Sequence, residues 1–275
     1  MDLPIRVGAV NYLNAKPLYY KLCEFAPDVR LTMEVPSRLA EQLADGELDV
    51  ALIPSVEYLR GADRGYEIIP GFAIAARGPV RSVKLFSRVP WNRVERLALD
   101  AGSRTSQVLA RIWLDEKHGV RPPRIEELPL GVSALESTAD AVLVIGDRAM
   151  RVPNEPFLDV VDLSLAWHQL TSLPFVFALW VARGGVELGE LPAALEQSRA
   201  LGLAEAAALA RLHGGRLGLD FATCYDYLTR ILSYELGEPE IAGLERFAAL
   251  AAGLGLAPKG VSLVFHRGRN LAPRR

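Results

Sequence analysis

Hydroxyl residues that could bind a small anion stand before a predicted helix. The stretch DAGSRTS, Asp100 to Ser106, has a glycine and three hydroxyl residues, Ser103, Thr105 and Ser106, directly before a helical pattern. A helix N-terminus exposes free N–H groups and carries a partial positive charge, so hydroxyl side chains there can help to bind a carboxylate or a phosphate. Serine and threonine are also common helix caps, and the stretch alone does not separate the two interpretations.

Two further polar positions follow predicted strands. GPVRSV holds Ser82, a candidate second donor to an anion, although a hairpin with an exposed arginine is the simpler interpretation. Gly146 follows an apolar run that ends at Ile145, and a glycine there lets the backbone approach a ligand closely. The next residue, Asp147, is interpreted as the cap of a following helix.

The N-terminal strand leads into a polar and aromatic turn. In VGAVNYLNAKPLYY, an apolar strand from Ile5 to Val10 is followed by two asparagines, a tyrosine and a proline. Asn14 stands at the strand end, where its uncharged amide can both donate to and accept from a hydroxyl group. Another apolar strand, DVALIP, is followed by Ser55, which can cap the next helix.

The sequence contains no motif for a strong catalytic base or a metal. HExxH, GxSxG, the Walker loop and GxGxxG are all absent, and the four histidines form no spacing typical of a Ser-His-Asp site. The two cysteines lie far apart, without a CxxC or a histidine at ligand spacing, which argues against zinc. We therefore expect a cleft for a small anion, with no metal and no organic cofactor.

The composition argues against several classes of partner. The chain has 275 residues, half of them hydrophobic, and a formal net charge of -2, so neither nucleic acid nor an anionic membrane is expected. The basic C-terminal cluster HRGRNLAPRR is interpreted as a solvated tail. No apolar run is long enough to span a membrane and no signal peptide is visible, so a cytoplasmic protein is expected. The oligomeric state stays open between monomer and homodimer.

Alternating strands and helices predict an α/β fold with two lobes. Apolar runs alternate with helical patterns, give way to successive strands after GFAIAAR, and then alternate again, until the chain becomes almost wholly helical from about Leu188. Two strands that cross between the lobes would leave a central cleft, with ligands outside the carboxyl ends of strands. The expected division is lobe one at 1–75 and 184–275, lobe two at 90–175, and crossover segments at 76–89 and 176–183.

Several segments in order resemble the MqnA family of the futalosine menaquinone pathway. They are NYLNAKPL, DVALIPSVEYL, GFAIAARGPVRSVKLFS, LALDAGSRTSQVLARI, ADAVLVIGDRAM and AWHQLTSLPFVFALWVAR, and YLTRILSYELGEPEIAGLERF is similar to the helical end. The resemblance implies a fold like that of type II periplasmic binding proteins. It also implies the activity of a chorismate dehydratase, in which chorismate loses water and becomes 3-[(1-carboxyvinyl)oxy]benzoate. The SPCPND-like segment of the sister family, which acts later in the pathway, is absent.

The resemblance also implies roles for the polar turns. Asn14 would act in catalysis by holding the C4 hydroxyl of chorismate or by orienting its enolpyruvyl group. The turn from Ser103 to Ser106, with Thr105, would bind one carboxylate. The remaining polar groups of the substrate are assigned to Ser82, together with Ser55 or the Ile145–Gly146 turn.

The proton acceptor and the activity itself each leave two hypotheses. Either a side chain such as Glu57 or His168 reaches the site as a base, or the enolpyruvyl carboxylate of the substrate takes the C3 proton, which we favour. The rival to the dehydratase is a non-enzymatic small-carboxylate binding protein, a receptor or a sensor, of the same fold.

Overall fold

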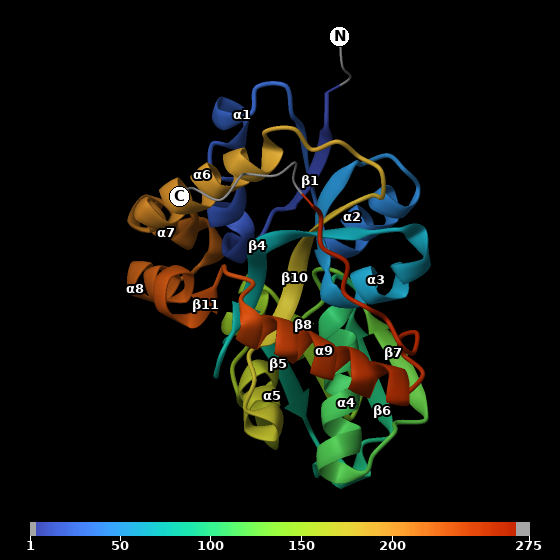
Figure 1. Cartoon of the computed structure of the whole chain (residues 1–275). Coiled ribbons are helices and arrows are strands. Elements are labelled where there is room, and N and C mark those ends of the chain that lie inside the picture. Colours follow the sequence, from blue (N-terminus) through green and yellow to red (C-terminus); the bar gives the residue numbers. More distant parts are fainter. Residues whose placement is uncertain (1–3, 268–275) are drawn as a thin grey trace.

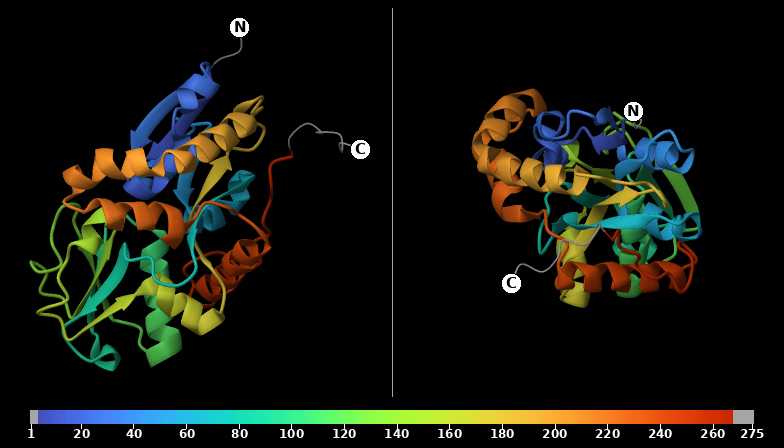
Figure 2. Two further views of the ribbon diagram at one scale, coloured as in Figure 1. Left: turned by 90° about the vertical axis from the view of Figure 1, so that its left-hand side faces the viewer. Right: turned by 45° about the horizontal axis from the view of Figure 1, so that its top comes forward.

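The structure, a computed structural model, describes residues 4–267 and contains two β-sheets with helices packed around them (Figure 1). In the left view of Figure 2 the N-terminal strands and helices, in blue, lie above the part that carries the second sheet, in green. The chain passes from the first sheet to the second after β4 and returns at β10.

The first sheet has six strands in the order β11-β4-β10-β3-β1-β2. Strand β1 pairs in parallel with β2 and β3, whereas β10 runs antiparallel to both β3 and β4. The central strands are continuous apolar runs buried on both faces, as expected for a sheet covered on each side. Their bounds are β1 Arg6–Val10, β2 Arg30–Glu34, β3 Val50–Pro54, β4 Glu67–Ala76, β10 Phe175–Ala182 and β11 Leu232–Ser233.

The second sheet has five strands in the order β7-β6-β8-β5-β9. Strand β6 pairs in parallel with β7 and β8, and β5 runs antiparallel to β8 and β9. The bounds are β5 Val83–Ser87, β6 Arg96–Asp100, β7 Arg124–Leu128, β8 Ala141–Ile145 and β9 Asp159–Asp162.

The helices cover these sheets and continue into the C-terminal part of the chain. Helix α9 packs against α4 and β10, and α6 packs against η1. The α-helices are α1 Leu22–Phe25, α2 Pro36–Ala44, α3 Ser55–Arg60, α4 Thr105–His118, α5 Leu163–Thr171, α6 Leu191–Ala204, α7 Ala206–Leu217, α8 Phe221–Asp226 and α9 Glu238–Gly253. The described residues also form four short 3₁₀ helices and one π-helix. These are η1 Leu13–Tyr19, η2 Ala62–Arg64, η3 Trp91–Arg93, η4 Asp147–Met150 and the π-helix η5 Tyr227–Ile231.

The predicted two-lobed α/β architecture with two crossing strands is confirmed, and the differences are local. The stretch KPLYYKLCEF, whose pattern predicts a helix with Pro17 in its first turn, instead forms the end of the 3₁₀ helix η1 followed by the short α1. Pro17 has no N–H to donate, and Lys21 breaks the helix by adopting a left-handed conformation. The C-terminal part, expected to be almost wholly helical, also contains strand β11 and the π-helix η5.

The C-terminal segment packs against the first sheet before the described residues end. Phe265 bridges Ile68 of β4, and His266 Nδ1 lies 2.7 Å from Glu67. The first part of the predicted solvated tail is therefore docked, and the rest, residues 268–275, lies outside the described residues.

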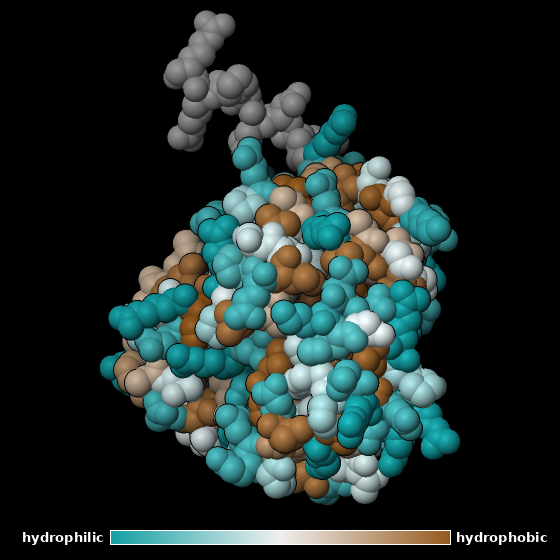
Figure 3. Space-filling view, turned by 90° about the horizontal axis from the view of Figure 1, so that it is seen from below, coloured by the Kyte–Doolittle hydropathy of each residue, from teal (hydrophilic) through white to brown (hydrophobic). Residues whose placement is uncertain are grey.

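Within residues 4–267, no helix combines the length and the apolar character that crossing a membrane requires. Seen from below, the surface interleaves hydrophilic and hydrophobic residues (Figure 3).

Candidate active site

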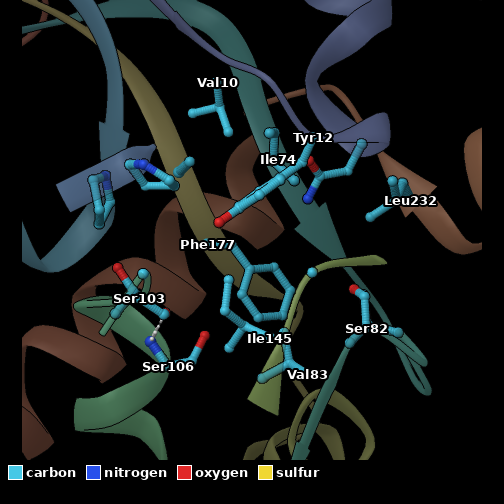
Figure 4. A pocket seen from close by; sticks show the side chains of 18 residues that line it. Val10, Tyr12, Ile74, Ser82, Val83, Ser103, Ser106, Ile145, Phe177 and Leu232 are labelled. Atoms are coloured by element: carbon cyan, nitrogen blue, oxygen red, sulfur yellow. Dashed lines mark hydrogen bonds between the residues drawn. The ribbon is translucent and has the colours of Figure 1, made fainter. Parts of the chain in front are cut away.

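A cleft between the two sheets collects almost all of the polar turns. The space between its walls, counted out to the open mouth, is about 570 Å³. Its polar lining comes from Tyr12, Asn14, Ser82, Ser103, Thr105 and Ser106, and the rest from Val10, Pro36, Pro54, Ile74, Val80, Val83, Gly102, Ile145, Gly146, Phe177, Ala178 and Leu232. Figure 4 shows Ser103 and Ser106 on one side and Ser82 on the other, with Phe177 and Ile145 between them.

The carboxyl ends of strands bring these residues together. Strand β1 leads to Asn14, β3 to Pro54, β6 to Ser103, and β8 ends at Ile145. Strands of two sheets thus direct their following turns into one cleft, which is where open α/β sheets bind ligands.

The turn before α4 both caps the helix and lines the cleft. Ser103 Oγ accepts a hydrogen bond from the N–H of Ser106 at 3.1 Å, so the capping interpretation is confirmed for Ser103. Thr105 Oγ1 accepts from the N–H of Val56 at 3.2 Å, which joins α4 to α3. Because the Ser55 hydroxyl donates to Val176, the Thr105 hydroxyl is the donor in its 3.4 Å contact with Ser55. The hydroxyl protons of Ser103 and Ser106 can donate to an anion at the helix start.

Ser55 is the one predicted contact that the structure does not bring to the cleft lining. It is fully buried, its Oγ donates to the backbone oxygen of Val176 at 2.7 Å, and it lies 3.4 Å from Thr105 Oγ1. Its side chain does not cap α3 either. Ser55 therefore ties α3 to β10 behind the cleft.

Asn14 and Tyr12 project from the turn after β1. The Oδ1 atom of Asn14 is buried and has no hydrogen-bond partner among the described residues, so it is an acceptor without a protein donor. Tyr12 lies close to Gly102 and Gly146, where a Cβ on Gly102 would come within 3.2 Å of its hydroxyl oxygen. Burial raises the pKa of Tyr12 to about 12, and the nearby Asp100 carboxylate adds to the rise, so Tyr12 is a neutral hydroxyl at neutral pH.

Two aspartates hold the turns around the cleft in place. Asp100 is buried and accepts from Arg148 and from the N–H groups of Ile145 at 2.9 Å and Gly102 at 3.0 Å. The side chain of Asp147 does not cap η4 as predicted. Its Oδ2 instead accepts a hydrogen bond at 3.3 Å from the N–H of Leu13, the first residue of η1. Burial raises the pKa of Asp147, while the Leu13 N–H and Lys16 oppose the rise.

Sequence reasoning missed Tyr227, a residue in direct contact with the site. Its hydroxyl donates to Ser82 Oγ at 2.7 Å, and both residues are almost completely buried. Tyr227 belongs to CYDYLTRILSYEL, whose tyrosines look alike in an apolar helical pattern, so the sequence carried no signal that separated it from the core.

None of the residues that line the cleft has a charged side chain. The two bases considered from the sequence lie elsewhere: Glu57 pairs with Arg60 at 2.7 Å, and His168 Nδ1 lies 3.4 Å from the backbone oxygen of Leu173. Residues 4–267 also contain no group of three or more His, Cys, Asp or Glu side chains that could hold a metal ion. The cleft therefore offers neutral donors and acceptors to a ligand.

Comparison with known proteins identifies the family. The model of a family described as menaquinone biosynthesis matches residues 5–253. This chain belongs to the menaquinone biosynthesis family. Within it, the chain is 35% identical over 272 residues to a chorismate dehydratase of Thermus thermophilus, covering 93% of this chain and 97% of that protein. It is 28% identical over 177 residues to a chorismate dehydratase of Campylobacter jejuni, covering 62% and 64% of the two chains.

Solved structures confirm the fold of this family member. Protein AF1704 of Archaeoglobus fulgidus superposes with a TM-score of 0.75 at 18% identity, covering 92% of this chain and 98% of that one. The periplasmic aliphatic sulphonate binding protein SsuA of Escherichia coli superposes with a TM-score of 0.64 at 15% identity, covering 100% and 97%. The predicted periplasmic-binding-protein-like fold and the resemblance to the MqnA family are both confirmed.

Proposed function

We propose that this protein is a chorismate dehydratase, a hydro-lyase that converts chorismate to 3-[(1-carboxyvinyl)oxy]benzoate and water. The observation that carries the proposal is a cleft lined by neutral hydroxyl and amide groups on apolar walls, in a member of a family whose curated relatives are chorismate dehydratases. Such a cleft suits a cyclic dicarboxylate, because the ring contacts apolar side chains while each carboxylate meets hydrogen-bond donors.

The two sides of the cleft suit the two carboxylates. Ser103, Ser106 and the free N–H groups at the start of α4 form one donor set, to which the helix dipole adds a partial positive charge. Ser82 and the backbone at Gly146 form the other set, across Phe177, whereas the N–H of Ile145 already donates to Asp100. We assign one substrate carboxylate to the start of α4 and the remaining polar groups to the second set.

The reaction breaks the C3–H and C4–O bonds of chorismate. The electron pair of the C3–H bond becomes the new π bond that makes the ring aromatic, and the C4–O pair leaves with the oxygen. The proton from C3 combines with this hydroxide as water, so the step is redox-neutral. We assign the C4 hydroxyl or the enolpyruvyl group to Asn14, because it lines the cleft and its Oδ1 has no partner among the described residues.

We assign the role of proton acceptor to the substrate's own enolpyruvyl carboxylate. The lining of the cleft contains no charged side chain, and Glu57 and His168 are engaged elsewhere. A carboxylate is a weak base, but its position within the same molecule gives it a high effective concentration, and the product gains aromatic stabilisation.

A non-enzymatic carboxylate binding protein is the alternative, favoured by the structural likeness to SsuA. The decisive experiment mixes the purified protein with chorismate in a chelator-containing buffer and follows ultraviolet absorbance and product mass. Loss of one water with retention of the enolpyruvyl ether is the expected result, and it would also show that no metal is required. Binding without any change in mass would overturn the dehydratase and support the binding protein.

A further inference from the structure

We propose that Tyr227 is a positioning residue for the reaction, which fixes the direction of the Ser82 hydroxyl through the hydrogen bond between their side chains. This inference rests on the proposed function, because it assigns Ser82 to the substrate. Tyr227 is fully buried and does not line the cleft, whereas Ser82 does. Tyr227 therefore acts through Ser82.

The direction of the hydrogen bond decides what Ser82 can offer. A serine hydroxyl is one donor and two acceptor lone pairs, and its proton rotates to suit its surroundings. Here the Tyr227 hydroxyl donates to Ser82 Oγ at 2.7 Å. With this lone pair occupied, the Ser82 proton is free to point into the cleft, toward an acceptor such as a carboxylate. Hydrogen bonds in a chain also polarise one another, which strengthens Ser82 as a donor.

Tyr227 suits the role of a fixed donor because it does not ionise near neutral pH. Burial raises the pKa of Tyr227 well above its usual value, and its neighbours Ser82 and Asn14 oppose only part of the rise. The contact between η1 and η5 also brings the element that carries Tyr227 next to the one that carries Asn14.

A π-helix sets Tyr227 at this position. Within η5 the N–H of Leu232 donates to the backbone oxygen of Tyr227, five residues earlier. Leu232 lines the cleft and pairs with Ala76 of β4. The wide turn thus allows Tyr227 and Leu232 both to reach the site, and π-turns inside helices are frequent at functional sites.

The test is a double-mutant cycle on chorismate turnover and on chorismate binding by calorimetry, with Tyr227→Phe, Ser82→Ala and the double variant. Phenylalanine keeps the ring and removes only the hydroxyl. We expect Tyr227→Phe to raise the KM for chorismate about tenfold with a smaller change in kcat, the size expected for one hydrogen bond to a charged group. In the Ser82→Ala background the same change should have almost no further effect.

Tyr234→Phe is the matched control. Tyr234 is also buried, and its hydroxyl has no hydrogen-bond partner among the described residues, so removing it should leave KM and kcat unchanged. Kinetics of Tyr227→Phe equal to those of the wild type would overturn the proposal. Independent, additive effects of Tyr227→Phe and Ser82→Ala would overturn it as well, because Tyr227 would then act by another route.

The two proposals fail in different ways. A wild-type protein that binds chorismate without turnover would overturn the proposed function, while the cycle measured on binding alone would still decide whether Tyr227 acts through Ser82. A wild-type protein that turns chorismate over, with additive variants, would overturn only the role of Tyr227.

Discussion

Asn14 places an uncharged amide in the lining of the cleft, which we propose binds a substrate with two negative charges. Asn14→Asp keeps the size of the side chain and puts a carboxylate into the cleft, so we expect kcat/KM for chorismate to fall roughly 100-fold or more through like-charge repulsion. Asn11→Asp is the control, because Asn11 is exposed, accepts from Lys16 at 3.2 Å and does not line the cleft. Steady-state kinetics of the two variants decide the matter: similar losses in both would contradict a direct role of Asn14.

Ser103 and Ser106 differ in what they do for the protein itself. Ser103→Ala removes the acceptor for the Ser106 N–H and should reduce the free energy of unfolding by about 1 kcal/mol, as for other lost helix caps, besides weakening binding. Ser106→Ala should weaken binding alone. Denaturant unfolding measures the loss of stability in each variant, and chorismate titration measures the loss of binding. Equal unfolding midpoints for Ser103→Ala and Ser106→Ala would contradict the capping role of Ser103.

At the scale of residues, the sequence predicted those polar groups that follow strand ends directly. Seven of the eight named site residues line the cleft. Turns near the carboxyl ends of buried strands lie at the edge of the sheet where ligands bind. Ser55 fits the same pattern, yet its hydroxyl turns back to Val176. That partner comes from a strand 121 residues later in the chain, and no local pattern can reveal it.

At the scale of elements, Asp147 fastens η4 to the turn that begins η1. Its pKa is raised by burial, so the folded state holds its proton more tightly than the unfolded state does. The ionised carboxylate therefore lowers stability as pH rises from the unfolded pKa through the folded pKa, and the full penalty remains at neutral pH. Asp147→Asn keeps an acceptor for the Leu13 N–H without the charge.

We expect Asp147→Asn to melt at a higher temperature than the wild type at pH 7, with the difference shrinking as the pH falls toward the usual range of an aspartate. Thermal unfolding measured across this range checks the sign. A wild type more stable than Asp147→Asn at neutral pH would show that the charge itself is stabilising in the folded state.

The elements that escaped prediction are those whose form depends on distant partners. The π-helix η5 ends at Ile231, and the next residue, Leu232, pairs with Ala76 of β4, a partner far away in the sequence. The 3₁₀ helix η1 is different, because Pro17 inside the predicted helix was already visible in the sequence. A proline is tolerated in the first turn of an α-helix, but Pro17 lies inside η1, where its missing N–H prevents a regular α-helical hydrogen bond.

At the scale of the whole molecule, side-chain contacts join the two halves around the cleft, and three of them differ in burial. Thr105 accepts from the Val56 N–H, Asp147 accepts from the Leu13 N–H, and Arg104 pairs with Glu41 at 2.9 Å. Each pair combines one residue near the first sheet with one near the second, so these contacts hold the two halves together in this arrangement.

These contacts contribute different free energies because they differ in burial. Thr105→Val leaves the buried Val56 N–H without its acceptor, and we expect the KM for chorismate to rise about tenfold as closure becomes less favourable. Glu41→Gln breaks an exposed ion pair that contributes between about 0 and 1 kcal/mol, so its KM should change little. Kinetics, with small-angle scattering of the unliganded variants, test this order, and a larger effect of Glu41→Gln would reverse it.

The overall architecture was accessible from sequence because it follows from the order of strands and helices. Alternating patterns, interrupted once by successive strands, are sufficient to require two sheets joined by two crossings. The contacts that hold the halves together were not accessible, since they join turns that are close only after both sheets have formed.

The uncharged lining of the cleft has a consequence for ionic strength. Sites that hold carboxylates with lysine or arginine weaken as salt screens their charges, whereas short hydrogen bonds from hydroxyl, amide and backbone groups involve no full charge on the protein. Added sodium chloride between about 0.01 and 0.5 M, a range over which the screening length shortens several-fold, should therefore leave the KM for chorismate nearly constant. A steep rise of KM with salt would instead reveal a cation that reaches the substrate during turnover. A cleft of this kind would keep its affinity for a doubly charged ligand over a wide range of salt concentration.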